Sequence, residues 1–153
     1  MTNIPEIDRR ILRELHRDGR QPNAQLAERV GLSASQCWQR VRKLEKSGLI
    51  QGYTARINHD ALGAPETALV EISLERNEGY QLEDVCRRLA QFPEVLEAHI
   101  TSGEFDVFIK VAVSGTRGYE QFLKDKLYSI AGIRHSRSVF SLRCYKSETS
   151  FVP

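Results

Sequence analysis

The sequence predicts an α+β protein of two domains, residues 1–60 and 61–153. Three short segments at the N-terminus carry apolar residues at helical spacing. Beyond Pro65, strand-like alternation and helical spacing follow one another in the order βαββαβ. The first pattern is typical of a winged helix-turn-helix and the second of a ferredoxin-like fold of the dimeric α+β barrel type, with an antiparallel four-stranded sheet.

The first two predicted helices are short and amphipathic. One follows Pro5, ends near Asp18, and places four residues on its apolar face, namely Ile7, Ile11, Leu12 and Leu15. The next has Asn23 as its expected N-cap and Gly31 as a left-handed C-terminal stop. Its expected buried residues are Leu26, Ala27 and Val30.

The third predicted helix has the most sharply defined start. Ser33 and Gln36 form an S-x-x-Q capping box, and Leu32 can pack against Cys37 as a hydrophobic staple. Gly48 ends the helix after Lys46. The expected core-facing seam consists of Cys37, Val41 and Leu44.

The rest of this helix is hydrogen-bonding and cationic. Successive residues on a helix lie about 100° apart, which puts polar side chains opposite the seam or on one shoulder, and Trp38 on the other shoulder. The polar residues are Ser35, Gln36, Gln39, Arg40, Arg42, Lys43 and Lys46. Arg and Lys can bind guanine or phosphate and Gln can pair with adenine, so this face suits a major groove.

We expect different roles within that set. Gln39, Arg40 and Arg42 are the candidates for base or phosphate contact. Ser35 and Gln36 are placed to reach phosphates near the helix N-terminus, while Lys43 and Lys46 add charge. The plain alternative is an ordinary solvated basic helix, and the short capped partner helix with its glycine turn favours the DNA-binding interpretation. The sequence after this helix, LIQGYTARI, predicts a strand or short wing.

Charge and composition narrow the class of protein. Residues 1–60 hold 11 Lys and Arg against 7 Asp and Glu, whereas the remainder holds 11 against 13. A net charge of only +2 favours a few placed phosphate contacts over bulk coating of DNA. No apolar run is long enough for a membrane span and no secretion signal is evident, so we expect a cytoplasmic protein. Three widely spaced cysteines and four scattered histidines predict neither a disulfide nor a metal site.

The second domain consists of alternating predicted strands and helices. The expected strands are 67–75, 95–101, 105–113 and 133–145, and the expected helices are 80–92 and 119–131. Both helices of such a fold cover one face of the sheet. The opposite face also alternates with apolar residues, which predicts a homodimer through the sheets.

Three segments together resemble the Lrp/AsnC family of bacterial regulators, named for leucine-responsive and asparagine-responsive members. They are ID-R-ILREL near the start, SASQCWQRVRKLEKSGLIQGYTA, and SGEFDVFIKV, and the resemblance runs from about Ile7 to about Tyr145. It implies a DNA-binding domain, a linking strand, and a regulation-of-amino-acid-metabolism domain whose dimers often form octamers. It also implies a small amino acid as effector and no other cofactor.

The resemblance further implies an effector site at a turn between dimers. The matching residues are Ser102, Gly103, Glu104, Phe105 and Asp106, with Ser136 and Ser138 in place of a Thr-x-Thr pattern. Glu104 stands where the family most often has Asp, which changes the hydrogen bonding of the turn and leaves the effector open. The alternative for these residues is a β-hairpin turn with solvated acids and water-facing serines.

Two rival functions fit parts of the sequence. Paired ferredoxin-like sheets also occur in small enzymes, but the sequence holds no nucleophile, base or metal-ligand grouping, so we expect no catalysis. An effector-independent architectural DNA-binding protein is the other rival, and the mild net charge disfavours it.

Overall fold

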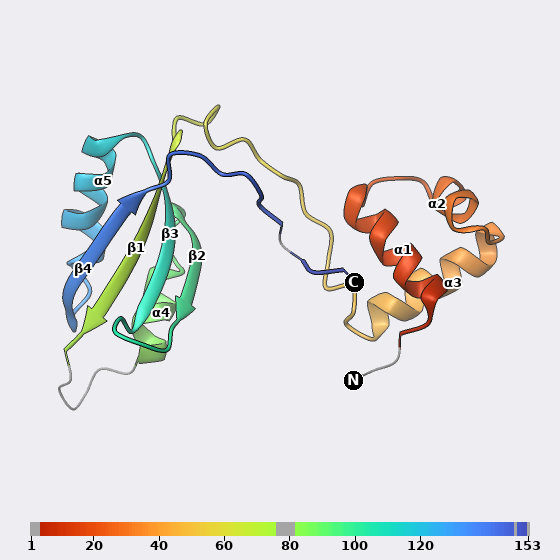
Figure 1. Ribbon diagram of the computed structural model, residues 1–153, viewed down its shortest axis with the longest axis horizontal. Coiled ribbons are helices and arrows are strands. Elements are labelled where there is room, and N and C mark those ends of the chain that lie inside the picture. The colour runs from red at the N-terminus through yellow and green to blue at the C-terminus, as the bar shows by residue number, and fades with distance from the viewer. Residues whose placement is uncertain (1–3, 76–81, 149, 153) are drawn as a thin grey trace. The chain divides into compact units, whose positions relative to one another are not determined.

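The computed structural model describes residues 4–75, 82–148 and 150–152, which fall into two compact units. The first unit comprises Met1–Arg56 together with Lys146–Pro153, and the second comprises Ile57–Tyr145 (Figure 1). Each unit has a hydrophobic core of its own. Each is therefore described separately.

The first unit is a three-helix head made of α1 (Glu6–Arg17), α2 (Asn23–Val30) and α3 (Ala34–Lys46). Its core is formed by the predicted apolar faces, with Ile11 and Cys37 completely buried. The other buried members are Leu26, Ala27, Val30 and Leu44. Val41 is partly buried and packs against them, so the predicted seam of α3 is confirmed.

The turn before α3 has the predicted geometry. Gly31 has φ 74°, and the Leu32 amide donates to the Ala27 carbonyl at 2.9 Å. The Ser33 hydroxyl accepts from the Gln36 amide at 3.3 Å, while the Gln36 side-chain oxygen accepts from the Ser33 amide at 3.2 Å. Because both halves of the capping box are formed, the start of α3 is fixed by side chains as well as by packing.

The expected cap of α2 is wrong by one residue. Pro22 is the N-cap and Asn23 is the first helical residue. The Asn23 side chain instead donates to the Ala34 carbonyl at 2.8 Å, which ties the start of α2 to the start of α3. A local capping pattern could not reveal this contact, because its acceptor lies eleven residues away.

The strand or wing expected after α3 is not formed within residues 49–58, all of which the structure describes. The segment has no sheet partner in this single chain. β-favouring residues form a strand only where a neighbouring strand accepts their backbone hydrogen bonds. The residues do favour extended structure, but the prediction of a strand or wing at this position is wrong for the single chain.

The second unit has the predicted βαββαβ order. Its elements are β1 (Glu66–Leu74), α4 (Leu82–Leu89), β2 (Val95–Ile100), β3 (Val107–Val113), α5 (Thr116–Phe122) and β4 (Ile133–Phe140). The antiparallel sheet has the order β2-β3-β1-β4, and α4 and α5 lie on one face of it (Figure 1). This is a ferredoxin-like arrangement.

The alternation along β1 and β3 builds the core beneath the helices. Ala68, Val70 and Ile72 of β1 are completely buried, as are Val107 and Ile109 of β3. Helix residues close the same core, namely Val85, Leu89, Tyr119, Phe122 and Leu127. The helical and strand periodicities therefore identified the correct faces.

Several element boundaries differ from expectation, since α4 ends at Leu89 rather than at Phe92 and β3 begins at Val107 rather than at Phe105. The expected start of α4, at Tyr80, lies outside the described residues. After α5 the chain continues as a π-helix, η1 (Leu123–Leu127), in which the Tyr128 amide reaches the Leu123 carbonyl at 2.9 Å. β4 ends at Phe140, opposite Ala68, rather than at Tyr145. The Ser141 amide still donates to the Thr67 carbonyl at 2.8 Å, but β1 begins at Glu66 and leaves no partner for residues 143–145.

We predict that Ser33→Ala lowers the free energy of unfolding of the head by about 1 kcal/mol, because it removes the side-chain acceptor of the cap. Ser35→Ala is the matched control, since Ser35 is exposed and its hydroxyl contacts the Ser33 hydroxyl at 3.4 Å but does not supply the acceptor for the Gln36 amide. Thermal denaturation followed by circular dichroism at one protein concentration measures both variants. Equal stability of the two variants would contradict the importance of the capping box.

Candidate nucleic-acid interface and ligand turn

Helix α3 presents a polar and cationic surface to solvent. Six of its seven predicted contact residues are exposed: Ser35, Gln36, Gln39, Arg42, Lys43 and Lys46. The helix has 13 residues and is therefore about 20 Å long, and its apolar side is held against α1 and α2. A rigid helix with this outer face has the size and chemistry needed to lie in a major groove.

Arg40 has a different environment from the other cations. Its Nη1 donates to Asp8 Oδ1 of α1 at 2.8 Å, and Asp8 is only 8% exposed. The pair joins α3 to α1 and neutralises a buried carboxylate. The structure therefore gives Arg40 a role inside the head, which the helical projection alone did not distinguish from DNA contact.

Gln36 also has a structural task. Its side-chain oxygen accepts from the Ser33 amide at 3.2 Å and lies 3.0 Å from the Ser33 hydroxyl. Only its amide nitrogen is left to face a partner molecule. Ser35 is exposed next to the amides of the first turn of α3, where a phosphate would be stabilised by the helix N-terminus.

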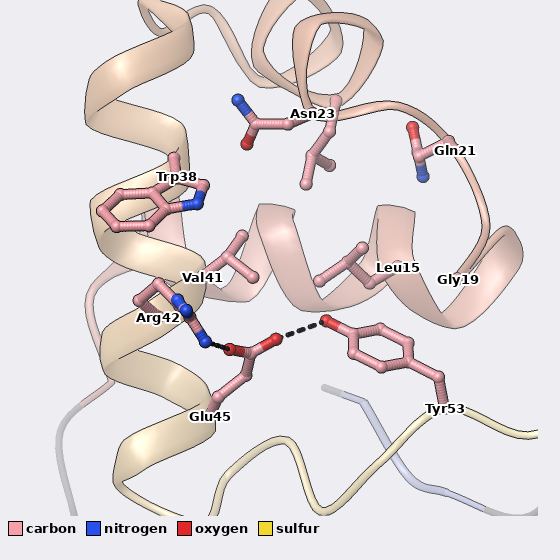
Figure 2. Close-up of a pocket in the computed structure, with 10 residues that line it drawn as sticks. Leu15, Gly19, Gln21, Asn23, Trp38, Val41, Arg42, Glu45 and Tyr53 are labelled. Atoms are coloured by element: carbon pink, nitrogen blue, oxygen red, sulfur yellow. Dashed lines mark hydrogen bonds and ion pairs between the residues drawn. The ribbon is translucent and has the colours of Figure 1, made fainter.

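Sequence reasoning missed a second group of residues beside the exposed polar face of α3. A cavity of about 240 Å³ opens between the end of α1, α2, α3 and the segment after α3. Trp38, Arg42, Glu45 and Tyr53 line one part of it (Figure 2). The position of Trp38 on the shoulder of α3 was visible in the helical projection, but the approach of Tyr53 was not.

These four side chains form a chain of contacts in space, from Trp38 through Arg42 and Glu45 to Tyr53. The Arg42 guanidinium lies over the Trp38 ring, 5.4 Å from its centroid, and its Nη1 is 3.6 Å from Glu45 Oε2. Tyr53 Oη donates to Glu45 Oε1 at 3.3 Å (Figure 2). Burial and the negative charge of Glu45 raise the pKa of the Tyr53 hydroxyl, so it stays protonated and remains a donor.

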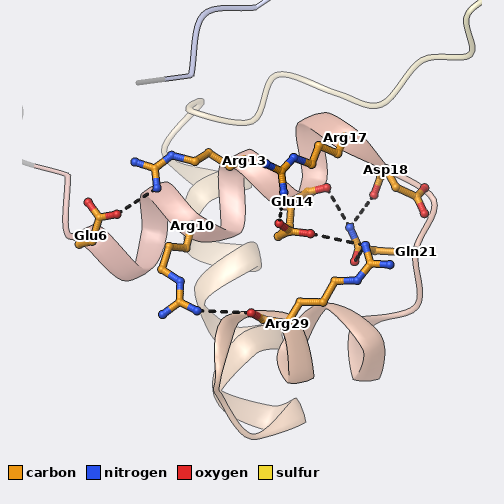
Figure 3. A network of polar contacts seen from close by, with 8 residues as sticks. All are labelled: Glu6, Arg10, Arg13, Glu14, Arg17, Asp18, Gln21 and Arg29. Atoms are coloured by element: carbon orange, nitrogen blue, oxygen red, sulfur yellow. Dashed lines mark hydrogen bonds and ion pairs between the residues drawn. The ribbon is translucent and has the colours of Figure 1, made fainter.

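Five further arginines of the head, Arg9, Arg10, Arg13, Arg17 and Arg29, lie on α1 and α2. Arg17 donates to Glu14 at 2.8 Å, Arg13 to Glu6 at 3.0 Å, and Arg29 approaches Glu14 at 3.4 Å (Figure 3). The first two contacts lie within α1, whereas Arg29 joins α2 to α1 through Glu14 and also donates to Gln21, whose side-chain amide donates to the Glu14 carbonyl. The positive surplus of residues 1–60 is therefore divided between this network and α3.

The predicted ligand turn lies between β2 and β3. Gly103 has φ 133°, where other residues are strained, and Ser102 and Glu104 are exposed. Asp106 has a structural function, because its Oδ2 accepts from the Leu74 amide at 2.7 Å and its own amide donates to the Ile72 carbonyl at 2.9 Å. The turn is thereby fastened to β1 at one end, while residues 102–104 stay open.

Phe105 and the two predicted serines of β4 lie near the same end of β1. Arg137 lies over the Phe105 ring, 4.8 Å from its centroid. In the ladder between β1 and β4, Ser136 is paired with Ile72 and Ser138 with Val70. The Ser136 hydroxyl hydrogen-bonds the Tyr128 hydroxyl at 2.7 Å, and the Ser138 hydroxyl hydrogen-bonds the Tyr119 hydroxyl. The structure therefore brings the turn and β4 together, but it directs both serine hydroxyls toward tyrosines on the helix side.

Within residues 4–75, 82–148 and 150–152, no three His, Cys, Asp or Glu side chains are grouped as a metal site requires. In the same ranges, no helix combines the length and apolar character needed to cross a bilayer. Burial raises the pKa of the Cys37 thiol, which packs in the core of the head as a small hydrophobe.

The fold and the exposed face of α3 define a helix-turn-helix DNA-binding protein with a ferredoxin-like companion domain. Residues 4–51 match the family model described as winged helix-turn-helix DNA-binding, and residues 67–151 match the Lrp/AsnC ligand binding domain. The chain therefore belongs to the Lrp/AsnC family of transcriptional regulators.

Individual relatives agree with this assignment. The leucine-responsive regulatory protein of Escherichia coli K12 is 37% identical over 150 residues, which cover 98% of this chain and 92% of that protein. A transcriptional regulator from Neisseria meningitidis in complex with L-methionine has a TM-score of 0.90 at 29% identity, over 97% of this chain and 96% of that one. A feast or famine regulatory protein from M. tuberculosis complexed with L-methionine has a TM-score of 0.86 at 36% identity, over 97% and 98% of the two chains.

We predict that Arg40→Ala and Arg42→Ala have different consequences. Arg40→Ala should lower the free energy of unfolding by about 1 to 3 kcal/mol, because it leaves the buried Asp8 carboxylate without its cation. Arg42→Ala should leave stability nearly unchanged and weaken DNA binding by about 1 to 3 kcal/mol if Arg42 reads a base, or lower the salt slope by about one if it contacts phosphate.

Denaturant unfolding and salt-dependent binding titrations of both variants make this comparison. Each variant serves as the control for the other. Equal loss of stability in the two variants would show that the Arg40–Asp8 pair does not stabilise the head. An unchanged DNA affinity and salt slope for Arg42→Ala would exclude Arg42 from the DNA interface.

Proposed function

We propose that two copies of α3 enter successive major grooves of an operator, about 34 Å apart, and that a small amino acid bound near residues 102–106 changes the assembly of the protein and hence its affinity for DNA. The observation that carries the DNA-binding part is the exposed face of α3. This face displays hydrogen-bonding and cationic groups along a helix whose other side and first turn are fixed.

Within this face we assign the base or phosphate contacts to Gln39 and Arg42, with Lys43 and Lys46 at the phosphates. Gln39 can pair with adenine and Arg42 with guanine, and both are exposed. Ser35 and Gln36 lie at the helix N-terminus, where a phosphate is favoured. Arg40 is retained as a secondary candidate, since its side chain is 41% exposed beside Asp8.

The amino-acid part of the proposal draws on the relatives and on the turn. The solved regulators from N. meningitidis and M. tuberculosis were obtained with L-methionine, and several relatives are leucine-responsive. In this chain the backbone at Gly103 is unobstructed, because a Cβ added there would meet nothing within 4 Å. Open backbone groups beside Ser102 and Glu104 can bind the amino and carboxylate ends of an amino acid.

The open face of the sheet supports homodimer formation. Leu69, Phe108 and Val139 alternate there with charged residues, and Val139 is 56% exposed. The charges are paired within the face, with Lys110 donating to Glu97 at 3.0 Å and Arg137 to Glu71 at 2.7 Å. Paired charges can be covered at lower cost than single ones, so we propose that a second copy covers this face and that dimers assemble into octamers.

We propose regulation without catalysis. The polar groups that could serve a reaction near the turn are used by the fold, with Asp106 bound to the Leu74 amide and the two serines of β4 bound to tyrosines. A protein whose partner is chromosomal DNA works where the chromosome lies, which in bacteria such as those of the relatives is the cytoplasm.

An electrophoretic mobility shift with the DNA upstream of the protein's own gene tests the proposal. We expect a specific complex that survives competitor DNA and whose affinity or stoichiometry changes with L-methionine or L-leucine. Binding that is equal for operator and random DNA would contradict sequence-specific regulation. Specific binding that no amino acid alters, across all twenty, would favour the architectural alternative.

We predict that Gly103→Trp abolishes the response to the amino acid, while dimerisation and DNA binding remain measurable. A side chain at this position both strains the backbone at φ 133° and fills the open side of the turn. Gly63→Trp is the matched control, since Gly63 has φ 85° and also has open space around it. An unaltered effector titration for Gly103→Trp would exclude this turn from the binding site.

A further inference from the structure

Tyr53 lies on the segment that leaves the head, three residues before the first unit ends at Arg56. Its ring packs against Gly19 at the end of α1, where a Cβ on Gly19 would lie 3.1 Å from Tyr53 Cδ1. Gly19 does not have positive φ, so its backbone would accept another residue. Glycine at this position therefore makes room for the tyrosine ring.

The hydroxyl of the same tyrosine reaches the recognition helix. It donates to Glu45 Oε1, while the other oxygen of Glu45 faces Arg42, and the Arg42 guanidinium rests on Trp38 (Figure 2). The side chain at the exit of the head is thus two contacts away from the strongest DNA-binding candidate. All four residues belong to the first unit.

We propose that Tyr53 is a positioning residue for DNA binding, which holds Glu45 and thereby orients Arg42 over Trp38. The proposal rests on the assignment of Arg42 to the DNA interface. A long arginine side chain loses several rotatable bonds of freedom when it binds, so a side chain already oriented loses less.

Through this arrangement the segment after α3 can also affect how Arg42 binds DNA. In this proposal, a change in the segment after α3 acts on the recognition helix by displacing the Tyr53 ring from Gly19. Displacement removes the hydrogen bond to Glu45 and releases Arg42. The state of the connecting segment is therefore coupled to the recognition helix through identified side chains.

The test is a double-mutant cycle on operator affinity with the full-length protein. Tyr53→Phe keeps the ring on Gly19 and removes only the hydroxyl, and we expect it to weaken binding roughly two- to fivefold, the usual effect of one hydrogen bond. In an Arg42→Ala background the same change should have no effect, because Tyr53 acts through Arg42. Tyr145→Phe controls for the loss of a tyrosine hydroxyl elsewhere in the chain, since Tyr145 is 87% exposed.

An equal effect of Tyr53→Phe in both backgrounds would overturn the proposal, because it would mean that Tyr53 contacts DNA itself or supports the fold. A lowered melting temperature that accounts for the lost binding would overturn it as well. A second pair of variants tests the packing of the Tyr53 ring on Gly19. Gly19→Leu places a side chain where the ring lies, whereas Gly52→Leu is the control, because a Cβ on Gly52 would have nothing within 4 Å. Only Gly19→Leu should weaken binding, and equal affinities of the two variants would contradict the coupling.

The outcome also separates this inference from the proposed function. If the unmodified protein binds no operator, the proposed function fails. If operator binding and the effect of Arg42→Ala are present but the cycle is additive, only the role of Tyr53 fails.

Discussion

The polar face of α3 reaches solvent only because the helix is held in one orientation about its own axis, and the proposed DNA-binding surface depends on this constraint. Neighbouring helical residues point about 100° apart, so a turn by one position would move polar side chains into the core. Cys37 and Leu44 oppose such a rotation by burial, and the Arg40–Asp8 pair opposes it from α1. The cap at Ser33 adds a fixed starting point. Core, ion pair and cap therefore select the same orientation.

Local signals were sufficient to predict most of the fold. The left-handed Gly31, the capping box and the period-two alternation of β1 each depend on residues close together in sequence, and each is present in the structure. The roles of Arg40 and Arg42 could not be separated in this way. Their positions on the helix are similar, and the deciding partner of Arg40 lies 32 residues away in α1. For the same reason, the sequence pattern identified Tyr53 only as a strand former.

The proposed ligand turn, residues 102–106, is not uniform in its contacts. The resemblance pointed to residues 102–106 as one group, but the structure divides them. Asp106 fastens the turn to β1 by accepting from the Leu74 amide, whereas Ser102 and Glu104 stay exposed around Gly103. These bonds anchor the end of the turn that follows the open backbone. The contribution of Asp106 to an effector site would then be to preorganise the turn.

The distribution of charge limits how strongly one head can hold DNA. Along α3, which the structure describes in full, the exposed cations are Arg42, Lys43 and Lys46, since Arg40 is paired with Asp8. Most arginines of α1 contact acidic or carbonyl groups in the head. Each neutralised phosphate contributes about 0.9 to the salt slope, so a single head has modest affinity at physiological salt. Linking heads raises affinity without any new contact, by increasing the effective concentration of the second head. For the proposed homodimer, affinity for DNA would then depend strongly on the state of assembly, and a small ligand bound at the sheet domain would act on that state.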